Sequence, residues 1–369
     1  MVKGSLSMIN CFLFGTYNKM IETILKKDIR QLSKAALEGV FADMGEPRFR
    51  AKQIHEWLWQ KGAHSFEAMT NVSKVLREKL AESFVIQNIT LDKKQISLDG
   101  TIKSRWRLHD GHLVESVLIP VPEEKRFTVC VSCQVGCSLT CSFCATGRMK
   151  RVRNLDAAEI FDQVVLVNQQ SLEVFGHPLT NIVYMGMGEP LLAYSNVLES
   201  VERITSPEGL GMSPKRITVS TAGIAKMIKK LADDGVKFNL ALSLHAADDA
   251  KRNEIMPINE QNDLASLLEA LTYFYTTTGN RISYEYIAFQ NFNDNIEDAK
   301  NLLKLCKRFP VRVNIIEYNP IDGAPFLKSS QHKIDEFAQY LTDHGVMVTV
   351  RRSRGKDIDA ACGQLANKE

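Results

Sequence analysis

The chain has 369 residues, of which 44% are hydrophobic and 24% charged, with a formal net charge of +3. These proportions exclude a disordered polyelectrolyte and provide enough apolar material for a large core with a smaller appendage. No apolar run reaches the roughly 18 residues of a membrane-spanning helix, so the eight cysteines indicate free thiols in the reducing cytoplasm.

The first twenty residues combine Lys3 with a short apolar stretch at 8–14, a pattern that resembles a weak secretion signal. A small-residue cleavage site is lacking, and Lys19 soon interrupts the apolar stretch. We interpret this segment as an extension or a frayed end. Three methionines stay open as translation starts, Met1, Met8 and Met20.

Residues 1–105 are predicted to form a small helical accessory module that could contact nucleic acid. Two apolar groups at helical spacing support it, the first comprising Phe49, Ile54, Trp57 and Leu58 and the second Val75, Leu76 and Leu80. Trp57 and Trp59 are more typical of core packing than of base stacking. Turn signals at Asp99-Gly100 and Asp110-Gly111 then predict β-hairpins, with residues 106–122 as a β linker into the next domain.

Five of the eight cysteines lie within fifteen positions, Cys130, Cys133, Cys137, Cys141 and Cys144. The last three form a C-x-x-x-C-x-x-C run that brings three thiolates onto one compact loop. Three ligands suit a [4Fe–4S] cluster with one iron left open to an outside molecule, because a fourth cysteine would close that position. An open iron implies chemistry as well as electron transfer.

Two other interpretations of the cysteines stay open. Cys130 with Cys133 and Cys141 with Cys144 form two C-x-x-C pairs that could close a structural zinc site, although zinc would leave Cys137 unexplained. A disulfide framework is less favoured, because the chain is long and shows no convincing export signal. The remaining cysteines lack a partner in the pattern, and we interpret Cys11 and Cys306 as incidental, with Cys306 in a helix core.

Strands that alternate with helices are predicted from the cysteine cluster onward. Asp156, with Glu159 three residues later, predicts a helix start. Apolar runs predict six strands, at 127–131, 181–185, 216–220, 237–244, 281–287 and 311–318. This order predicts an α/β fold with a parallel sheet, which we interpret as a partial (β/α)6 TIM-like barrel over residues 123–355, followed by a tail at 356–369.

Polar residues gather where these strands end. Candidate site residues in these positions are Gly188, Glu189, Ser220, Ser243, Leu244, His245 and Asn319. Each alone is explained as a turn glycine, a capping serine or a satisfied histidine. Because the carboxyl ends of barrel strands meet on the face where substrates bind, their shared placement favours a binding site.

Two basic groups adjoin the cysteines. They comprise Arg148, Lys150, Arg151 and Arg153 after the cysteine loop, and Arg351, Arg352, Arg354 and Lys356 before Cys362. Either group alone is typical of a solvated face. Their position next to reactive cysteines favours an anionic substrate such as a nucleic acid backbone.

Several of these motifs together resemble one family. The three-cysteine loop, the Gly-Glu turn and the tail Asp357-Ile358-Asp359-Ala360-Ala361-Cys362-Gly363-Gln364-Leu365 resemble the RlmN family of radical S-adenosylmethionine (SAM) RNA methyltransferases, over roughly residues 47–365. The cysteine triplet alone indicates only the radical superfamily, whereas Cys130-Val131-Ser132 and the Ala-Cys-Gly-Gln-Leu tail are specific. The resemblance implies a radical SAM barrel that methylates C2 of an adenosine in 23S rRNA and of the adenosine 3′ of the anticodon in some tRNAs.

The resemblance also implies how two cofactors are held. Cys137, Cys141 and Cys144 would bind a [4Fe–4S] cluster whose open iron chelates SAM. The contacts to SAM would come from Gly188, Glu189, Ser220, Ser243, Leu244 through its backbone, His245 and Asn319. C2 of adenine is electron-poor and carries no lone pair, so it cannot attack a sulfonium methyl. A radical route that consumes two SAM molecules per turnover is implied instead.

Three residues would carry the reaction in this family. Cys362 would be methylated by one SAM and then lose a hydrogen to the 5′-deoxyadenosyl radical from a second, so that its methylene radical adds to adenine. Glu115 would accept the proton from C2, although by itself it is only a carboxylate in a predicted strand, typical of a surface residue. Cys130 would attack the Cys362 sulfur and leave a disulfide. A thiol reductant and a low-potential electron donor such as flavodoxin are therefore implied, for a cytoplasmic monomer without a membrane partner.

One position departs from the family, and two other functions stay as hypotheses. Cys133 stands where serine is frequent, and we interpret it as a tolerated small residue that could form an unproductive disulfide with Cys130. A Cfr-type relative would methylate C8 of the same rRNA adenosine, although the Gly-Glu-Pro turn and the doubled alanine before Cys362 are more similar to RlmN. A zinc-stabilised, non-catalytic RNA-binding protein would leave Cys362 and the strand-end residues without a purpose.

Overall fold

The computed structural model describes residues 26–368, which divide into two compact units. The first contains residues 26–88 with Ser206–Gly211, and the second contains the rest. The expectations for the first twenty residues, including Cys11, fall outside the described residues. Among the residues described, no helix is both long and apolar enough to cross a membrane.

The first unit is helical, as predicted. Its elements are α2 (Lys34–Asp43), α3 (Arg48–Trp59) and α4 (Lys74–Ser83), with β1 (Lys27–Asp28) paired in parallel with β2 (Phe84–Val85). Leu58, Trp59 and Leu80 are buried in its core. Two members of the predicted apolar groups, Phe49 and Val75, are exposed instead, because each lies in the first turn of its helix.

The second unit is built on one ten-stranded sheet with the order β14-β13-β12-β11-β10-β9-β6-β5-β4-β3. The strands are β3 (Thr90–Ile96), β4 (Ile102–Arg107), β5 (Leu113–Val121), β6 (Arg126–Cys130), β9 (Asn181–Tyr184), β10 (Ile217–Thr221), β11 (Asn239–Ser243), β12 (Ile282–Ala288), β13 (Val311–Glu317) and β14 (Met347–Arg351). All neighbours from β6 to β14 are parallel. The α/β partial barrel and its six predicted strands are confirmed. The edge strand β14 was not predicted, because exposed and half-buried residues alternate along it without an apolar run.

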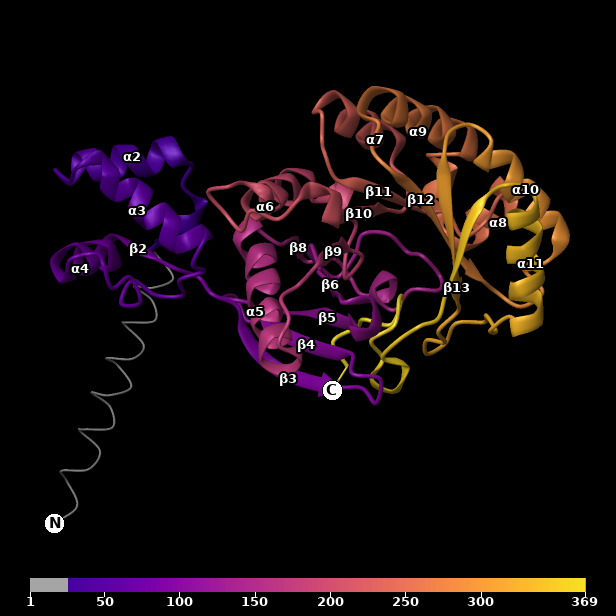
Figure 1. Cartoon of the computed structure of the whole chain (residues 1–369), viewed down its shortest axis with the longest axis horizontal. Coiled ribbons are helices and arrows are strands. Elements are labelled where there is room, and N and C mark those ends of the chain that lie inside the picture. Colours follow the sequence, from indigo (N-terminus) through magenta and orange to yellow (C-terminus); the bar gives the residue numbers. More distant parts are fainter. Residues whose placement is uncertain (1–25, 369) are drawn as a thin grey trace, which may run out of the picture. The chain divides into compact units, whose positions relative to one another are not determined.

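Helices join the parallel strands and lie along the outer side of the curved sheet (Figure 1). They are α5 (Ala157–Phe175), α6 (Tyr194–Thr205), α7 (Ala225–Asp233), α8 (Asp249–Ile255), α9 (Leu264–Thr278), α10 (Ile296–Cys306) and α11 (Gln331–Asp343). The predicted start of α5 is confirmed, because Asp156 and Glu159 form a reciprocal capping box. Cys306, at the last residue of α10, is half-buried.

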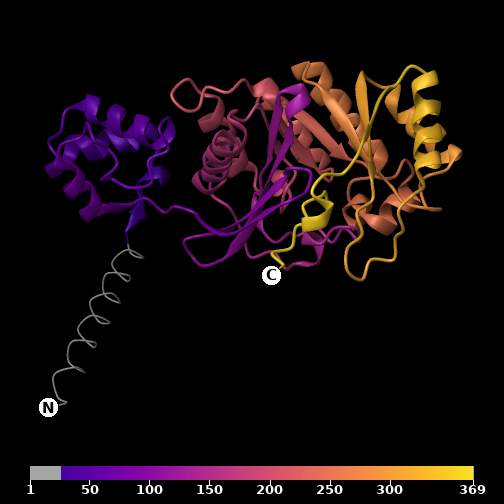
Figure 2. The ribbon, with the colours of Figure 1, turned by 60° about the horizontal axis from the view of Figure 1, so that its bottom comes forward.

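The predicted hairpins β3–β4–β5 extend the sheet in antiparallel order. Gly100 and Gly111 occupy their turns with φ of 85° and 84°, where glycine adopts the left-handed region without strain. The C-terminal segment 355–368 lies beside these strands (Figures 1 and 2). Ser97 Oγ donates to Asp357 Oδ1 at 2.5 Å, and the Gly355 amide donates to Asp99 Oδ2 at 2.9 Å. The hairpins thus position the tail that carries Cys362.

Candidate active site

The cysteine loop leaves β7 (Gln134–Val135) and returns through β8 (Arg153–Asn154), which pairs with it. Gly136, with φ of 72°, lies so close to the returning segment that a Cβ there would meet the Lys150 carbonyl oxygen at 2.4 Å. The Cys144 amide donates to the Cys141 carbonyl at 3.2 Å, and the Leu139 amide donates to Cys137 Sγ at 3.4 Å. The short loop therefore folds tightly on itself.

All three cysteines of this loop line one cavity of about 900 Å³, part of it open to solvent. Nine of the predicted site residues line it, namely Cys137, Cys141, Cys144, Gly188, Glu189, Ser220, Ser243, His245 and Cys362. Four do not line it, namely Cys130, Glu115, Leu244 and Asn319. The cavity thus gathers these residues from the ends of three parallel strands, β9, β10 and β11, and from the cysteine loop and the tail.

The donor set of the loop fits an iron-sulfur cluster better than a single zinc ion. Burial raises the pKa of Cys137 to about 11 and also raises those of Cys141 and Cys144, so metal-free thiols stay protonated. Across the described residues, no three His, Cys, Asp or Glu side chains surround a position for one metal ion. Cys133 Sγ instead faces the Met187 carbonyl at 3.7 Å. The described residues therefore hold no ready four-cysteine zinc site of the kind that the C-x-x-C pairs permitted. A donor set of three thiolates suits a cluster that keeps one iron open.

Glu189 and Gly188 form the polar wall opposite the cysteine loop. Glu189 is 3% exposed, and its carboxylate accepts the Leu191 amide at 3.0 Å and the Ala222 amide at 2.8 Å. Burial raises the pKa of this carboxyl group. Gly188 has φ of 101°, and a Cβ there would meet Gln134 Cβ at 2.5 Å. On the neighbouring strand ends, Ser220 Oγ lies 3.2 Å from Ser243 Oγ.

His245 is a neutral, buried member of the cavity wall. Its Nδ1 accepts the Ile287 amide at 3.1 Å, and its ring meets Phe143 edge-on at 4.7 Å. Burial, together with the charge of Arg252, lowers the pKa of His245 to about 3. Its φ of 56° lies in the left-handed region.

This histidine should make folding stability sensitive to acid. As the pH falls below about 6.5 the unfolded state binds a proton that folded His245 refuses, so stability is lost until about pH 3. We expect the free energy of unfolding of wild type to fall by about 1.4 kcal/mol more between pH 7.5 and 5.5 than that of His245→Asn, as measured by urea unfolding. Asparagine is chosen because it tolerates the positive φ of this position. The exposed His332→Asn is the control. Equal losses in both variants and wild type would contradict this expectation.

The tail brings Cys362 to the cavity. The Ala145 amide donates to the Gly363 carbonyl at 2.7 Å, and Thr146 Oγ1 donates to the Leu365 carbonyl at 2.6 Å. Cys362 is exposed, whereas Cys130, at the end of β6, is buried. Burial raises the pKa of the Cys130 thiol, and the neighbouring Cys362 raises it further. All seven cysteines within the described residues are free thiols.

Glu115 is a buried anchor for the tail rather than the surface residue that its sequence context suggests. It is 1% exposed, and its Oε2 accepts the amides of Ala366 at 3.0 Å and Asn367 at 3.1 Å. Its Oε1 lies 3.6 Å from the buried ammonium of Lys103. In this conformation both oxygens are occupied.

Loss of one partner from the buried ion pair between Glu115 and Lys103 should lower folding stability strongly. Glu115→Gln leaves Lys103 buried without a counter-charge, and we expect a loss of about 3–5 kcal/mol in urea unfolding, with earlier proteolysis of the tail. Lys103→Met combined with Glu115→Gln should recover part of this loss. Glu269→Gln, which breaks an exposed ion pair with Lys229, should cost under about 1 kcal/mol. Similar losses in the free energy of unfolding for Glu115→Gln and Glu269→Gln would show that the buried ion pair contributes no more to stability than the exposed one.

The cavity wall holds two charged residues that the sequence analysis did not assign to the site: Glu285 was not named, and Arg351 was named only as part of a basic group. Glu285, in the middle of β12, is 3% exposed and accepts hydrogen bonds from Asn314 Nδ2 at 2.7 Å and Ser283 Oγ at 2.8 Å. Arg351 Nη1, from β14, lies 3.5 Å from its other oxygen. The lone carboxylate inside an apolar strand pattern is the signal that could have identified Glu285. The position of Arg351 in the cavity wall could not be identified, because it depends on β14, a strand that was not predicted.

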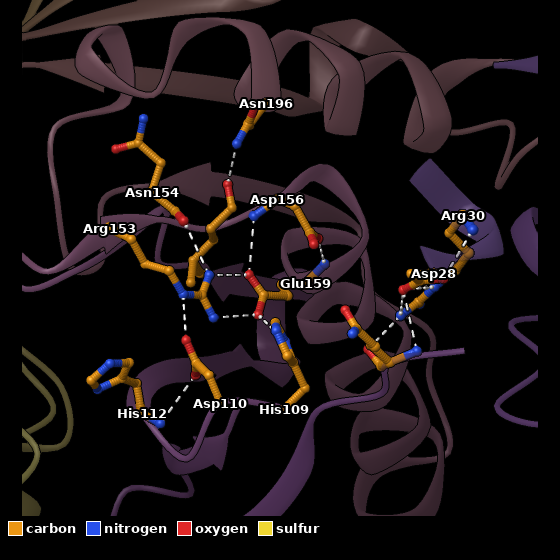
Figure 3. Close-up of polar contacts among 12 residues, drawn as sticks. Asp28, Arg30, His109, Asp110, His112, Arg153, Asn154, Asp156, Glu159 and Asn196 are labelled. Atoms are coloured by element: carbon orange, nitrogen blue, oxygen red, sulfur yellow. Dashed lines mark hydrogen bonds and ion pairs between the residues drawn. The ribbon is translucent and has the colours of Figure 1, made fainter. Parts of the chain in front are cut away.

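The two basic groups divide into paired and unpaired residues. Arg153 is locked into the protein, because it donates to Asp110 at 2.6 Å and to both oxygens of Glu159 at 2.7 and 2.8 Å (Figure 3). Internal partners also hold Arg148, Arg351 and Lys356. Within these two basic groups, which the structure describes in full, the side chains without a polar partner are those of Lys150, Arg151, Arg352 and Arg354. These four are available to an anionic substrate without breaking an existing contact.

Comparisons with known proteins agree with the fold and the site. The ribosomal RNA large subunit methyltransferase N-terminal domain model matches residues 27–86, and the radical SAM superfamily model matches residues 131–306. A crystal structure of a radical SAM methyltransferase from Sphaerobacter thermophilus is similar with a TM-score of 0.87 and 40% identity, covering 93% of this chain and 100% of that one. Fold and site together define a radical SAM methyltransferase.

Curated relatives narrow this class. A probable dual-specificity RNA methyltransferase RlmN from Cytophaga hutchinsonii is 57% identical over 98% of this chain and 99% of its own length. A dual-specificity RNA methyltransferase RlmN from Anaeromyxobacter sp. is 44% identical over 92% and 91%. The chain therefore belongs to the RlmN family of radical SAM RNA methyltransferases. Membership implies a [4Fe–4S] cluster and SAM as cofactors, and RNA as the substrate.

Proposed function

We propose that the protein methylates C2 of an adenosine in 23S rRNA and C2 of the adenosine 3′ of the anticodon in tRNA. The methyl group passes through Cys362 in a ping-pong cycle. The single observation that supports this proposal most is the tail contact at Ala145 and Thr146, because it brings Cys362 to the cavity that the three-cysteine loop lines.

Most of the cofactor contacts come from residues that line the cavity. Cys137, Cys141 and Cys144 would hold the cluster, and Gly188, Glu189, Ser220, Ser243 and His245 would contact SAM. The family resemblance adds Leu244 and Asn319, which do not line the cavity in this conformation. When bound, the first SAM would supply a methyl cation equivalent, and the cluster with a second SAM would supply a carbon-centred radical. Glu189, a buried carboxylate, suits the amino group of SAM. Neutral His245 adds no charge to the site.

The protein side of the reaction involves two thiols and one carboxylate. The Cys362 sulfur takes up the methyl and later presents its carbon to adenine. Glu115 accepts the proton from C2 after its oxygens leave the tail amides. When the C2 proton leaves, the adduct also gives up its unpaired electron to the electron-transfer partner. Cys130 loses its proton and attacks the Cys362 sulfur, so that an S–S bond forms and an S–C bond breaks. The electron pair stays on the carbon attached to C2, which takes up a proton and becomes the methyl group.

The cycle needs reducing partners to start again. A thiol reductant cleaves the Cys130–Cys362 disulfide, and a low-potential donor such as flavodoxin supplies the electron for radical formation. Both reductants suit a cytoplasmic monomer. The RNA contacts the helical module within residues 1–105 and the unpaired Lys150, Arg151, Arg352 and Arg354. The β linker 106–122, the barrel 123–355 and the tail 356–369 form the catalytic part.

Mass spectrometry of nucleosides tests this function. Anaerobically reconstituted protein is incubated with SAM, a reductant and either a 23S rRNA fragment or tRNA. We expect 2-methyladenosine from both RNAs. 8-Methyladenosine would instead indicate a Cfr-type activity, and unchanged RNA from iron-loaded protein would contradict the proposal. One modified RNA of the two would restrict the substrate to that RNA.

A further inference from the structure

Arg252 is a buried cation without a buried counter-charge. This residue of α8 is 0% exposed, and its Nε donates to the Leu244 carbonyl at 3.1 Å. Its Nη2 donates to the carbonyls of Ala222 at 2.5 Å and Ser243 at 3.3 Å. Its Nη1 donates to the side-chain oxygen of Asn259. Every acceptor is neutral.

No carboxylate forms an ion pair with Arg252 in the part of the chain that the structure describes. The closest acidic group along the hydrogen bonds is Asp249, which is exposed and accepts from Asn259 Nδ2 at 2.8 Å. A fully buried charge costs several kcal/mol unless an anion or strong hydrogen bonds offset it. The neutral acceptors satisfy the N–H groups of Arg252, but they leave its positive charge without a buried counter-charge.

The cysteine loop docks directly on the helix that carries Arg252. The amide and hydroxyl of Ser142 donate to the Ile255 carbonyl at 3.0 and 3.3 Å, three residues after Arg252. Cys141 and Cys144 pack against the core group that contains Ile255 and Met256. Ile255 belongs to the same short helix as Arg252 and follows it by less than one helical turn. The guanidinium is thus carried by the helix on which the cysteine loop docks.

We propose that Arg252 is a positioning residue that supplies the counter-charge for the anionic cluster on Cys137, Cys141 and Cys144, and that this charge makes the cluster easier to reduce. The inference rests on the proposed cluster ligands. Three thiolates make the bound cluster negative, and each added electron increases that charge. A cation buried in low dielectric favours the reduced form. The same side chain ties together the segments after β10 and β11.

Redox titration of the cluster, followed by electron paramagnetic resonance, tests this role independently of methylation. Wild type is compared with Arg252→Met, which removes the charge, and with Arg252→Lys, which keeps the charge but not the planar fork. Lys251→Met is the matched control, because it removes a charge from the same helix that pairs with Asp298 at 2.5 Å. At one fixed potential we expect Arg252→Met to lower the ratio of reduced to oxidised cluster about tenfold, equivalent to 59 mV. Arg252→Lys and Lys251→Met should stay within about twofold of wild type.

Each outcome decides the proposal. Arg252→Met with full iron content and an unchanged ratio would overturn it, as would an equal shift in Lys251→Met. If Arg252→Met binds no iron, Arg252→Lys decides. An iron-loaded Arg252→Lys with a near wild-type ratio of reduced to oxidised cluster would support the role of the positive charge. An iron-free Arg252→Lys would overturn the proposal and show that the planar shape of the guanidinium is what matters. Wild-type protein that binds no iron would instead contradict the proposed function.

Discussion

Cys130→Ala is expected to leave the protein covalently attached to its RNA after a single round of reaction. In the proposed cycle the radical adduct joins Cys362 to adenine through carbon, and without the Cys130 thiol nothing would attack the Cys362 sulfur to release it. Denaturing electrophoresis with labelled RNA measures the trapped species, which we expect from most active molecules and from almost none in wild type. Cys133→Ala is the matched control, because this neighbouring thiol is also buried and should trap no RNA.

The companion variant Cys362→Ala should trap nothing and methylate nothing, because it cannot carry the methyl. A Cys130→Ala, Cys362→Ala double variant should behave like Cys362→Ala. If free protein is recovered from both single variants, the roles given to the two thiols are wrong. A trapped species from Cys133→Ala would move the resolving role to that residue.

Cys141→Ala is expected to remove the cluster and with it all methylation. Two remaining thiols cannot hold the cube, so iron should fall from about four atoms per chain to near zero. Activity should drop by more than roughly 10²-fold, because mutation of a residue that only hydrogen-bonds to a metal ligand can already lower activity by up to about that factor. Colorimetric iron analysis and the visible spectrum measure the loss. Cys306→Ala, which changes a half-buried thiol at the end of α10, should keep full iron.

The result also separates iron from zinc. Wild-type protein that contains zinc and no iron after anaerobic reconstitution would contradict the cluster assignment. Equal iron contents in Cys141→Ala and wild type would show that Cys141 is not a ligand.

Much of the sheet could be predicted because its central strands are covered on both faces. β12 is buried along its whole length, and such strands appear in a sequence as continuous apolar runs. The edge strand β14 lacks this signal, because its burial alternates and its pairing with β13 depends on a distant segment. Only tertiary contacts define such a strand.

The site divides in the same way. The cysteine loop could be predicted because its ligands are close in sequence, and the strand-end residues because parallel strands share one carboxyl edge. Arg252 and Glu285 could not, since their importance comes from burial beside groups far away along the chain. Glu115 was identified only by family resemblance. Its contact with the amides of Ala366 and Asn367 spans about 250 residues, which no local pattern reports.

The hydrogen bonds between Glu115 and the tail amides can form only late in synthesis of the chain. Ribosomes make the tail after every strand of the sheet, so the hairpins that receive it are complete before its amides emerge. A nascent chain can therefore assemble its barrel before Cys362 has been made. The Cys362 thiol reaches the cavity only after the strands that line it exist.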